Sequence, residues 1–186
     1  MVRKLLLTAA AGLTLTGMAS AQVVILGSSL GKECFTAVTT TTMPTSTEER
    51  ACTNALNSGT LEGRDLTATY VNRGIVRMRM NKFDSALADY AVAKNRRPAL
   101  GAIYLNEGAA LIAMGDAVGA IDSLEKSIEL DTQDAHAAYF NLGLAHELNG
   151  DTSAAYYSFR KALDLRPEWE RAEQELARFR IVEAES

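Results

Sequence analysis

Three glycines, Gly74, Gly108 and Gly143, recur at spacings of 34 and 35 residues, and similar neighbours recur with them. A fixed period of this size indicates stacked copies of one helical unit, so it constrains the fold more than any other feature. Six columns keep the same offset from each glycine. In order along the repeat they are Tyr70, Tyr104 and Tyr139; Asn72, Asn106 and Asn141; Ala86, Ala120 and Ala155; Tyr90, Leu124 and Phe159; Ala93, Ser127 and Ala162; and Pro98, Thr132 and Pro167.

The residue types in these columns suit two helices that pack closely. Glycine and the small-residue columns let the paired helices approach, while the tyrosine and large-residue columns fill the space beside them. Gly115-Asp116 and Gly150-Asp151 predict the turn within a hairpin, with aspartate capping the next helix, and Asn81-Lys82 replaces this pair in the first repeat. The prolines end the second helices. We therefore predict helices over 67–80, 84–96, 100–114, 118–130, 135–148, 152–164 and 168–183.

In period and residue types, the sequence resembles the tetratricopeptide repeat (TPR) family. The resemblance implies an all-α, right-handed solenoid of three hairpins, over residues 67–100, 101–135 and 136–167. A capping helix is expected within 168–186, because the last hairpin otherwise exposes an apolar face. Its apolar side is formed by Trp169, Ala172, Leu176 and Phe179.

Residues 22–66 lie outside the repeats and contain both cysteines, Cys34 and Cys52. We predict two helices here, near 29–39 and 45–56, the second opened by a capping pattern at Thr45 or Ser46. A lone cysteine pair in an exported chain favours a structural disulfide, and the alternative is a redox-active pair. The bonded helices would form a degenerate hairpin that caps the other end of the stack.

Residues 1–21 have the layout of a secretory signal peptide. Arg3 and Lys4 precede a short apolar run, and Ala19-Ser20-Ala21 supplies small residues for cleavage. The run is interrupted and falls short of the roughly 20 apolar residues that a spanning helix needs. We expect removal after Ala21, a periplasmic or secreted location, and no membrane insertion afterwards.

Charge excludes one class of partner. The net charge is −4, and loss of Arg3 and Lys4 makes it −6. This balance disfavours nucleic acid and anionic membrane surfaces as partners.

No catalytic or metal-binding set stands out, so we expect neither an enzyme nor a cofactor. The segment from Gly27 to Glu33 is one residue short of a phosphate-binding loop and lacks the hydroxyl that contacts magnesium. His136 and His146 are ten residues apart, too far for a metal pair on one helix face.

The resemblance places the ligand surface on the concave side, where the first helix of each hairpin lies. The implied groove positions are mainly apolar, so the carboxylate clamp of some family members is not expected. The asparagine column adds side chains that either bond the backbone of an extended ligand or steady the stack. Together these positions are Val71, Asn72, Ile75, Met78, Leu105, Asn106, Ala109, Ile112, Phe140, Asn141, Leu144 and Glu147.

Two functions remain open. The first is an adaptor that binds another protein or peptide in the groove. The second is a structural or self-associating module whose groove is filled by the chain's own segment Val23–Leu26, which is apolar and otherwise hard to place. The partner itself is not identified by the sequence.

Overall fold

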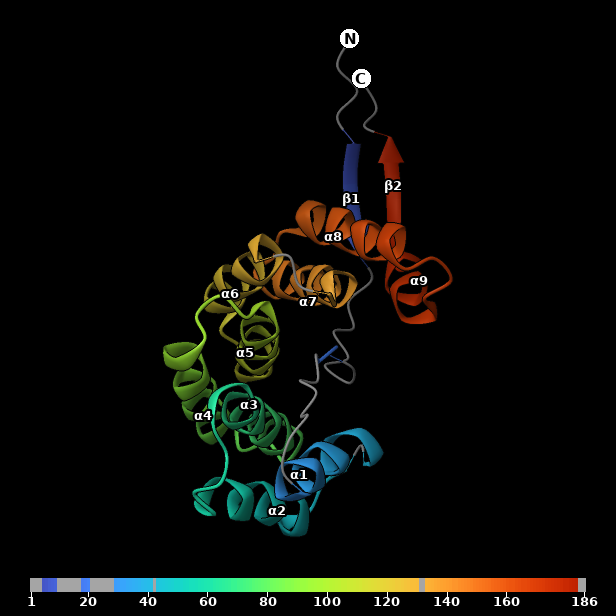
Figure 1. The fold of residues 1–186 in the computed structure, drawn as a ribbon. Helices are drawn as coiled ribbons and strands as arrows, with labels where there is room; N and C mark the ends of the chain where they lie inside the picture. The colour runs from blue at the N-terminus through green and yellow to red at the C-terminus, as the bar shows by residue number, and fades with distance from the viewer. Residues whose placement is uncertain (1–4, 10–17, 21–28, 42, 131–132, 184–186) are drawn as a thin grey trace.

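Small residues in one helix and large ones in the next produce a curved stack of hairpins, drawn in Figure 1. A computed structural model describes residues 5–9, 18–20, 29–41, 43–130 and 133–183. The prediction of an all-α solenoid is confirmed for the body of the chain, and a two-stranded ribbon is attached at one end. The elements are β1 (Leu5–Ala9), α1 (Ser29–Thr40), α2 (Ser46–Asn57), α3 (Gly63–Arg79), α4 (Phe83–Arg96), α5 (Gly101–Met114), α6 (Ala117–Glu129), α7 (Ala135–Leu148), α8 (Thr152–Leu165), α9 (Glu170–Leu176) and β2 (Phe179–Glu183).

The glycine column allows the close approach within each hairpin. A Cβ atom added to Gly74 would lie 2.3 Å from Cε1 of Tyr90. The same atom would lie 2.5 Å from Leu124 Cγ at Gly108, and 2.6 Å from Phe159 Cδ1 at Gly143. Each first helix therefore contacts the large residue sixteen positions later in the second helix, as the columns predict.

The turns within the hairpins also form as the sequence indicates. Gly115 and Gly150 have φ values of +83° and +81°, and Asn81 takes the same left-handed conformation at +59°. The carboxylates of Asp116 and Asp151 then accept backbone N–H bonds at the starts of α6 and α8. Asparagine therefore replaces glycine in the first repeat without loss of the turn.

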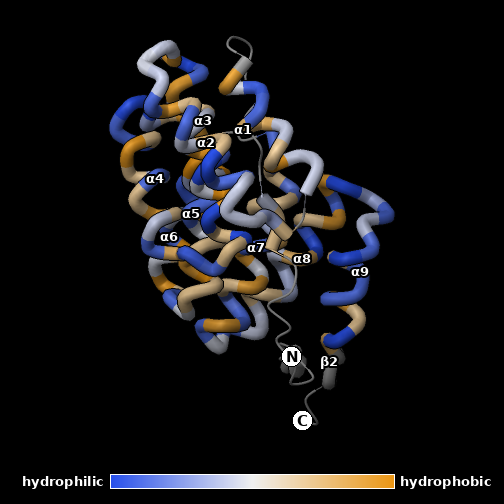
Figure 2. The backbone as a smooth tube through the Cα atoms, turned by 90° about the horizontal axis from the view of Figure 1, so that it is seen from below, coloured by the Kyte–Doolittle hydropathy of each residue, from blue (hydrophilic) through white to orange (hydrophobic). Residues whose placement is uncertain are grey.

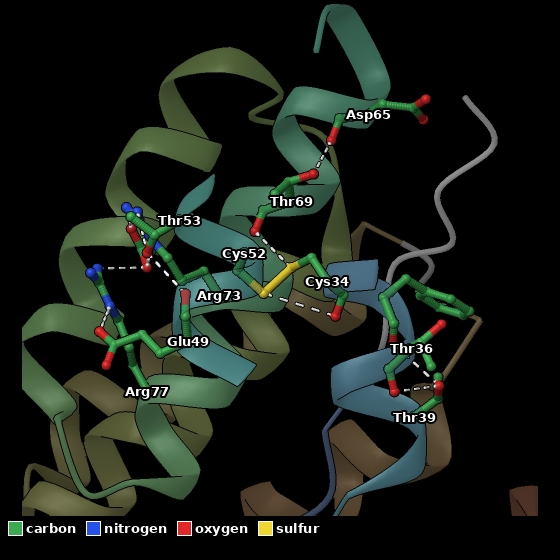
Figure 3. Close-up of a disulfide and its surroundings, with 12 residues drawn as sticks. Cys34, Thr36, Thr39, Glu49, Cys52, Thr53, Asp65, Thr69, Arg73 and Arg77 are labelled. Carbon is green, nitrogen blue, oxygen red and sulfur yellow. Dashed lines mark hydrogen bonds and ion pairs between the residues drawn. A yellow bond between two sulfur atoms is a disulfide. The ribbon is translucent and has the colours of Figure 1, made fainter. Parts of the chain in front are cut away.

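The N-terminal hairpin is closed by the predicted disulfide. Cys34 of α1 and Cys52 of α2 are bonded, with their Cα atoms 4.5 Å apart, and Thr69 of α3 lies beside the bond (Figure 3). Thr45 begins α2 with the predicted capping box, because its N–H donates to the Glu48 carboxylate at 2.7 Å. Ion pairs of Arg73 and Arg77 then join α2, α3 and α4.

At the C-terminal end the predicted helix over 168–183 is wrong beyond Leu176. Helix α9 ends there, and Figure 2 shows it as a mainly hydrophilic stretch at the edge of the stack. Residues 179–183 instead form β2, which pairs antiparallel with β1 from Ala9↔Phe179 to Leu5↔Glu183. Ile181 and Val182 are β-branched and favour the extended strand, and the partner strand supplies backbone hydrogen bonds that a helix would otherwise make.

The core consists of two apolar clusters along the stack. One extends from the disulfide hairpin to α5, and the other from α5 to α9. Met18 packs against both clusters from outside the helices. Residues 18–20, the short blue segment in Figure 1, lie on the inner side of the arc.

Candidate functional site

The concave side of the arc is built from α3, α5 and α7, and most of the predicted groove positions on these helices are buried in the core. Val71, Ile75, Leu105, Ala109 and Ile112 have no exposed surface. Phe140, Leu144 and Met78 keep at most 7% of theirs. These side chains support the stack and are covered by the protein itself.

One asparagine of the predicted column holds an extended piece of chain. The Oδ1 atom of Asn141 accepts a hydrogen bond from the Ala19 N–H at 2.9 Å. Its Nδ2 atom donates to the Ala19 carbonyl at 2.7 Å. The asparagine itself is fully buried. This paired contact recognises one residue of extended backbone through its peptide groups, so it places little demand on the side chain held there.

The other two asparagines differ in their contacts. Asn106 is also buried, but its Nδ2 donates to the Ala102 carbonyl one turn earlier in α5, at 2.8 Å. Asn72 is buried within α3. Both roles considered for the column thus occur in the molecule, backbone recognition at Asn141 and support of its own helix at Asn106.

A cavity of about 1010 Å³ opens beside the residue held by Asn141. Its walls come from the segment at 18–20, the ends of α3 and α5, the start of α7, and the chain around α9. The lining residues are Met18, Ala19, Ser20, Met78, Arg79, Asn81, Phe83, Ala113, Asp134, His136, Ala137, Arg166, Trp169 and Arg171. We call this space the arginine cavity, because three of its side chains are arginines.

The arginines of this cavity are held in place by aromatic rings and carbonyl groups. Arg166 lies 5.4 Å from the centre of the Trp169 ring, and Arg171 lies 5.3 Å from that of Phe140. Arg79 donates to the Val38 and Thr41 carbonyls near the end of α1, at 2.7 and 2.9 Å. Burial lowers the pKa values of Arg79 and Arg171 without discharging groups that titrate so far above neutral pH.

His136 shares this wall with Arg166. Its ring packs edge-on against Trp169 at 5.0 Å, and its Nε2 lies 3.3 Å from the Arg166 guanidinium. Burial, together with the charge of Arg166, lowers the pKa of His136 below its ordinary value. The imidazole is therefore neutral near pH 7 and adds no charge of its own.

With this geometry established, sequence comparison identifies the repeat unit. The family described as "Tetratricopeptide repeat" matches residues 136–169, which span α7, α8 and the exit from the third hairpin. The first two hairpins repeat the same columns and the same glycine contacts. The third hairpin is therefore a tetratricopeptide repeat, and the first two hairpins resemble it.

Solved structures share the fold of this chain. The crystal structure of MamA superposes with a TM-score of 0.59 at 22% identity, over 69% of this chain and 72% of MamA. The first TPR of Spaghetti (RPAP3), bound to the HSP90 peptide SRMEEVD, gives 0.57 at 19% identity, over 60% of this chain and 87% of that one. No curated protein matches the sequence. At these identities the likeness concerns the fold alone.

The last predicted groove residue of the stack, Glu147, faces the C-terminal segment. Its carboxylate forms an ion pair with Arg178 at 2.6 Å, just before β2. Burial raises the pKa of Glu147, and the charge of Arg178 opposes this effect. Glu147 thus anchors the chain after α9.

The described part of this protein offers binding groups and no assembled metal site. No group of three His, Cys, Asp or Glu residues there is arranged to hold a metal ion. His136 lines the arginine cavity, ten residues before His146 on the same helix. No described helix is both long and apolar enough to cross a bilayer. Val23–Leu26 lies outside the described residues.

The repeat pattern missed the residues that give the cavity its charge. Arg166, Trp169 and Arg171 come from the exit of α8 and the start of α9, on either side of Pro167, and none of the three belongs to one of the six columns. The sequence signal available for this site was the pair of arginines on either side of a tryptophan at the end of the last hairpin. The place of Met18–Ser20 had no signal, because its contact with Asn141 joins residues 122 positions apart.

Proposed function

We propose that this TPR protein is an exported scaffold that binds an extended peptide segment of another protein on its concave side. The observation that carries the proposal is the pair of hydrogen bonds between Asn141 and the backbone of Ala19. These bonds satisfy the buried amide through an extended backbone, which is what a bound peptide would offer. The solved neighbour whose title includes a bound peptide gives the same fold a precedent for this use.

Export would make the Asn141 position available. Removal of residues 1–21 takes away Met18, Ala19 and Ser20, and the Asn141 amide then needs another partner. An unpaired buried amide costs about 1–3 kcal/mol, so the vacated position favours a ligand with an extended backbone. In this proposal the chain acts in the periplasm or outside the cell, catalyses nothing, and needs no cofactor.

The first test measures binding of the hexapeptide TGMASA, the sequence of residues 16–21, to the exported chain. Intact mass establishes where the purified protein begins, and fluorescence polarisation gives the affinity. Asn141→Leu removes two hydrogen bonds and should weaken binding about tenfold, since each contributes roughly 0.5–1.5 kcal/mol.

Asn106→Leu is the matched control. It changes a buried asparagine in the same column whose Nδ2 donates to the Ala102 carbonyl, so it should reduce stability and weaken binding less than Asn141→Leu does. Equal affinities for the two variants would contradict the proposal. Lysine at Leu105 or Phe140 is a poor test, because both side chains are in the core and such variants would mainly report unfolding.

A second candidate function is a structural module whose groove stays filled from within. The same Ala19 contact favours it, with Met18–Ser20 as the filling segment in place of Val23–Leu26. This candidate predicts that the mature chain keeps residues 18–20 and does not bind the hexapeptide. Light scattering coupled to size exclusion would show whether such a chain also self-associates.

A further inference from the structure

Two sets of arginines in the described part of the chain differ in their partners. Arg73, Arg77 and Arg178 each meet a carboxylate, with nitrogen–oxygen distances of 2.7 Å to Asp89, 2.9 Å to Glu49 and 2.6 Å to Glu147.

Arg166 and Arg171 do not follow this pattern. Among the described residues, Arg166 contacts His136 and the Trp169 ring, and Arg171 lies over the Phe140 ring. Neither guanidinium has a carboxylate within ion-pair distance in the described part of the chain. Both line the cavity beside Ser20, next to the residue that Asn141 holds.

Other charges that face the cavity leave it positive. Arg79 carries a third positive charge, although its Nη1 is occupied by the Val38 and Thr41 carbonyls. Asp134 is the acidic residue of the lining, and His136 is neutral. Arginines that stack on aromatic rings are fixed in direction, so their remaining N–H groups are ready to meet a carboxylate.

We propose that Arg166 and Arg171 bind a carboxylate of the peptide, adjacent to the residue whose backbone Asn141 holds. This inference rests on the proposed function and adds the chemistry of the partner: an extended segment with an acidic side chain or its own C-terminus at that position. Arg166 follows the last residue of α8 and Arg171 lies in α9, so the carboxylate site is separate from the mainly apolar positions that the TPR pattern marks.

The first experiment uses the chain's own segment as the ligand. In the full-length protein, produced without export so that residues 1–21 remain, Ser20→Glu places a carboxylate against the cavity wall. The melting temperature should rise above that of Ser20→Gln, which is matched in size and uncharged. The difference should shrink with added salt. It should vanish when Arg166→Gln and Arg171→Gln are added. Equal melting temperatures for Ser20→Glu and Ser20→Gln would overturn the inference.

The second experiment uses added peptides and separates the two sources of the carboxylate. Amidated TGMASA has no carboxylate, the free acid has one at its C-terminus, and amidated TGMAEA has one on a glutamate side chain. A charge-assisted bond to arginine should strengthen binding of the acidic peptides about tenfold or more. The double glutamine variant should bring all three peptides to the affinity of the neutral one.

The outcomes distinguish the inference from the function on which it rests. If none of the peptides binds the exported chain, the proposed function fails, while the Ser20 series still decides the arginine site. If all three bind equally and the double glutamine variant changes nothing, the arginine site is refuted and the peptide-binding function stands. Whichever acidic peptide binds more tightly identifies the source of the carboxylate.

Discussion

At the N-terminal end of the stack a covalent bond joins α1 to α2, whereas at the C-terminal end aromatic rings pack around the last hairpin. Phe140 lies 5.5 Å from Phe159 and 5.0 Å from Trp169, measured between ring centres, and Phe159 lies 6.0 Å from Phe179. Each end of a repeat stack lacks a neighbour and must bury its outer face by other means. The comparison shows that a short hairpin with few large apolar residues uses a disulfide, while an aromatic end relies on burial.

The largest expected effect on this comparison comes from removing the aromatic side chain at the centre of the C-terminal end. Phe159 is fully buried, so Phe159→Ala should lower the free energy of unfolding by about 3–5 kcal/mol. Trp169 is the single tryptophan, and its fluorescence during chemical denaturation reports on this end. Tyr157→Ala changes an exposed ring of the same helix and should stay within about 0.5 kcal/mol of the parent. A similar loss in both variants would refute the assigned role of Phe159.

Removal of the disulfide should have the next largest effect, and at the opposite end. The bond closes a loop between residues 18 apart, so Cys34→Ser with Cys52→Ser should cost about 3 kcal/mol in the chain-entropy account. Because repeats are coupled mainly to their neighbours, helical circular dichroism should show an early loss from α1 and α2. The Trp169 transition should keep its midpoint. If both probes instead show one transition whose midpoint is lowered by the same amount, the two ends unfold as one unit.

The smallest expected effect is the change in stability on acidification, and it has opposite signs at the two ends. The hydrogen bond from Lys82 lowers the pKa of Glu49, so this group's stabilising contribution is complete above the unfolded pKa. It is lost as pH falls through the folded value. Burial raises the pKa of Glu147, so its contribution is favourable below the unfolded pKa and is lost as pH rises through the folded value. Acidification near and below pH ~4.5 should therefore weaken the N-terminal end relative to the C-terminal end.

Two substitutions sharpen this acid comparison. Glu49→Gln should reduce the acid-induced loss by about 1 kcal/mol or less, as expected for a pair near the surface. Glu147→Gln should remove the opposite slope. Hydrogen exchange of α2 and α7 between pH 3 and 6 would measure both ends in one sample. Identical pH slopes in the parent and the two variants would contradict these assignments.

How far the sequence predicts the structure depends on the range of the interaction involved. The hairpins and their turns follow from residues within one repeat, such as Gly108 against Leu124 and Asn81 in its left-handed turn, so they could be predicted. The disulfide could be predicted because the chain has only two cysteines. The strand at 179–183 could not, because its amphipathic pattern continues that of α9 and its partner strand is at the other end of the chain.

The candidate site divides in the same way. The asparagine column could be identified from the sequence, but not the fact that Asn141 holds Ala19 while Asn106 bonds to its own helix. The signal peptide over residues 1–21 stays a prediction. The arginine cavity could not be predicted, because Arg166 and Arg171 belong to no repeat column. Their positions depend on the aromatic rings against which they pack.

By itself, the sequence determined the repeating unit, the close approach at each glycine and the cysteine bond, since these depend on near neighbours and on residue size. The tertiary structure decided which apolar positions are core, that Asn141 holds the backbone of Ala19, and that Arg166 and Arg171 line one cavity without a carboxylate partner among the described residues. The physical reason is that curvature brings the ends of several helices and the exit of the last hairpin around one cavity. The repeat period of the sequence does not predict this arrangement around the cavity.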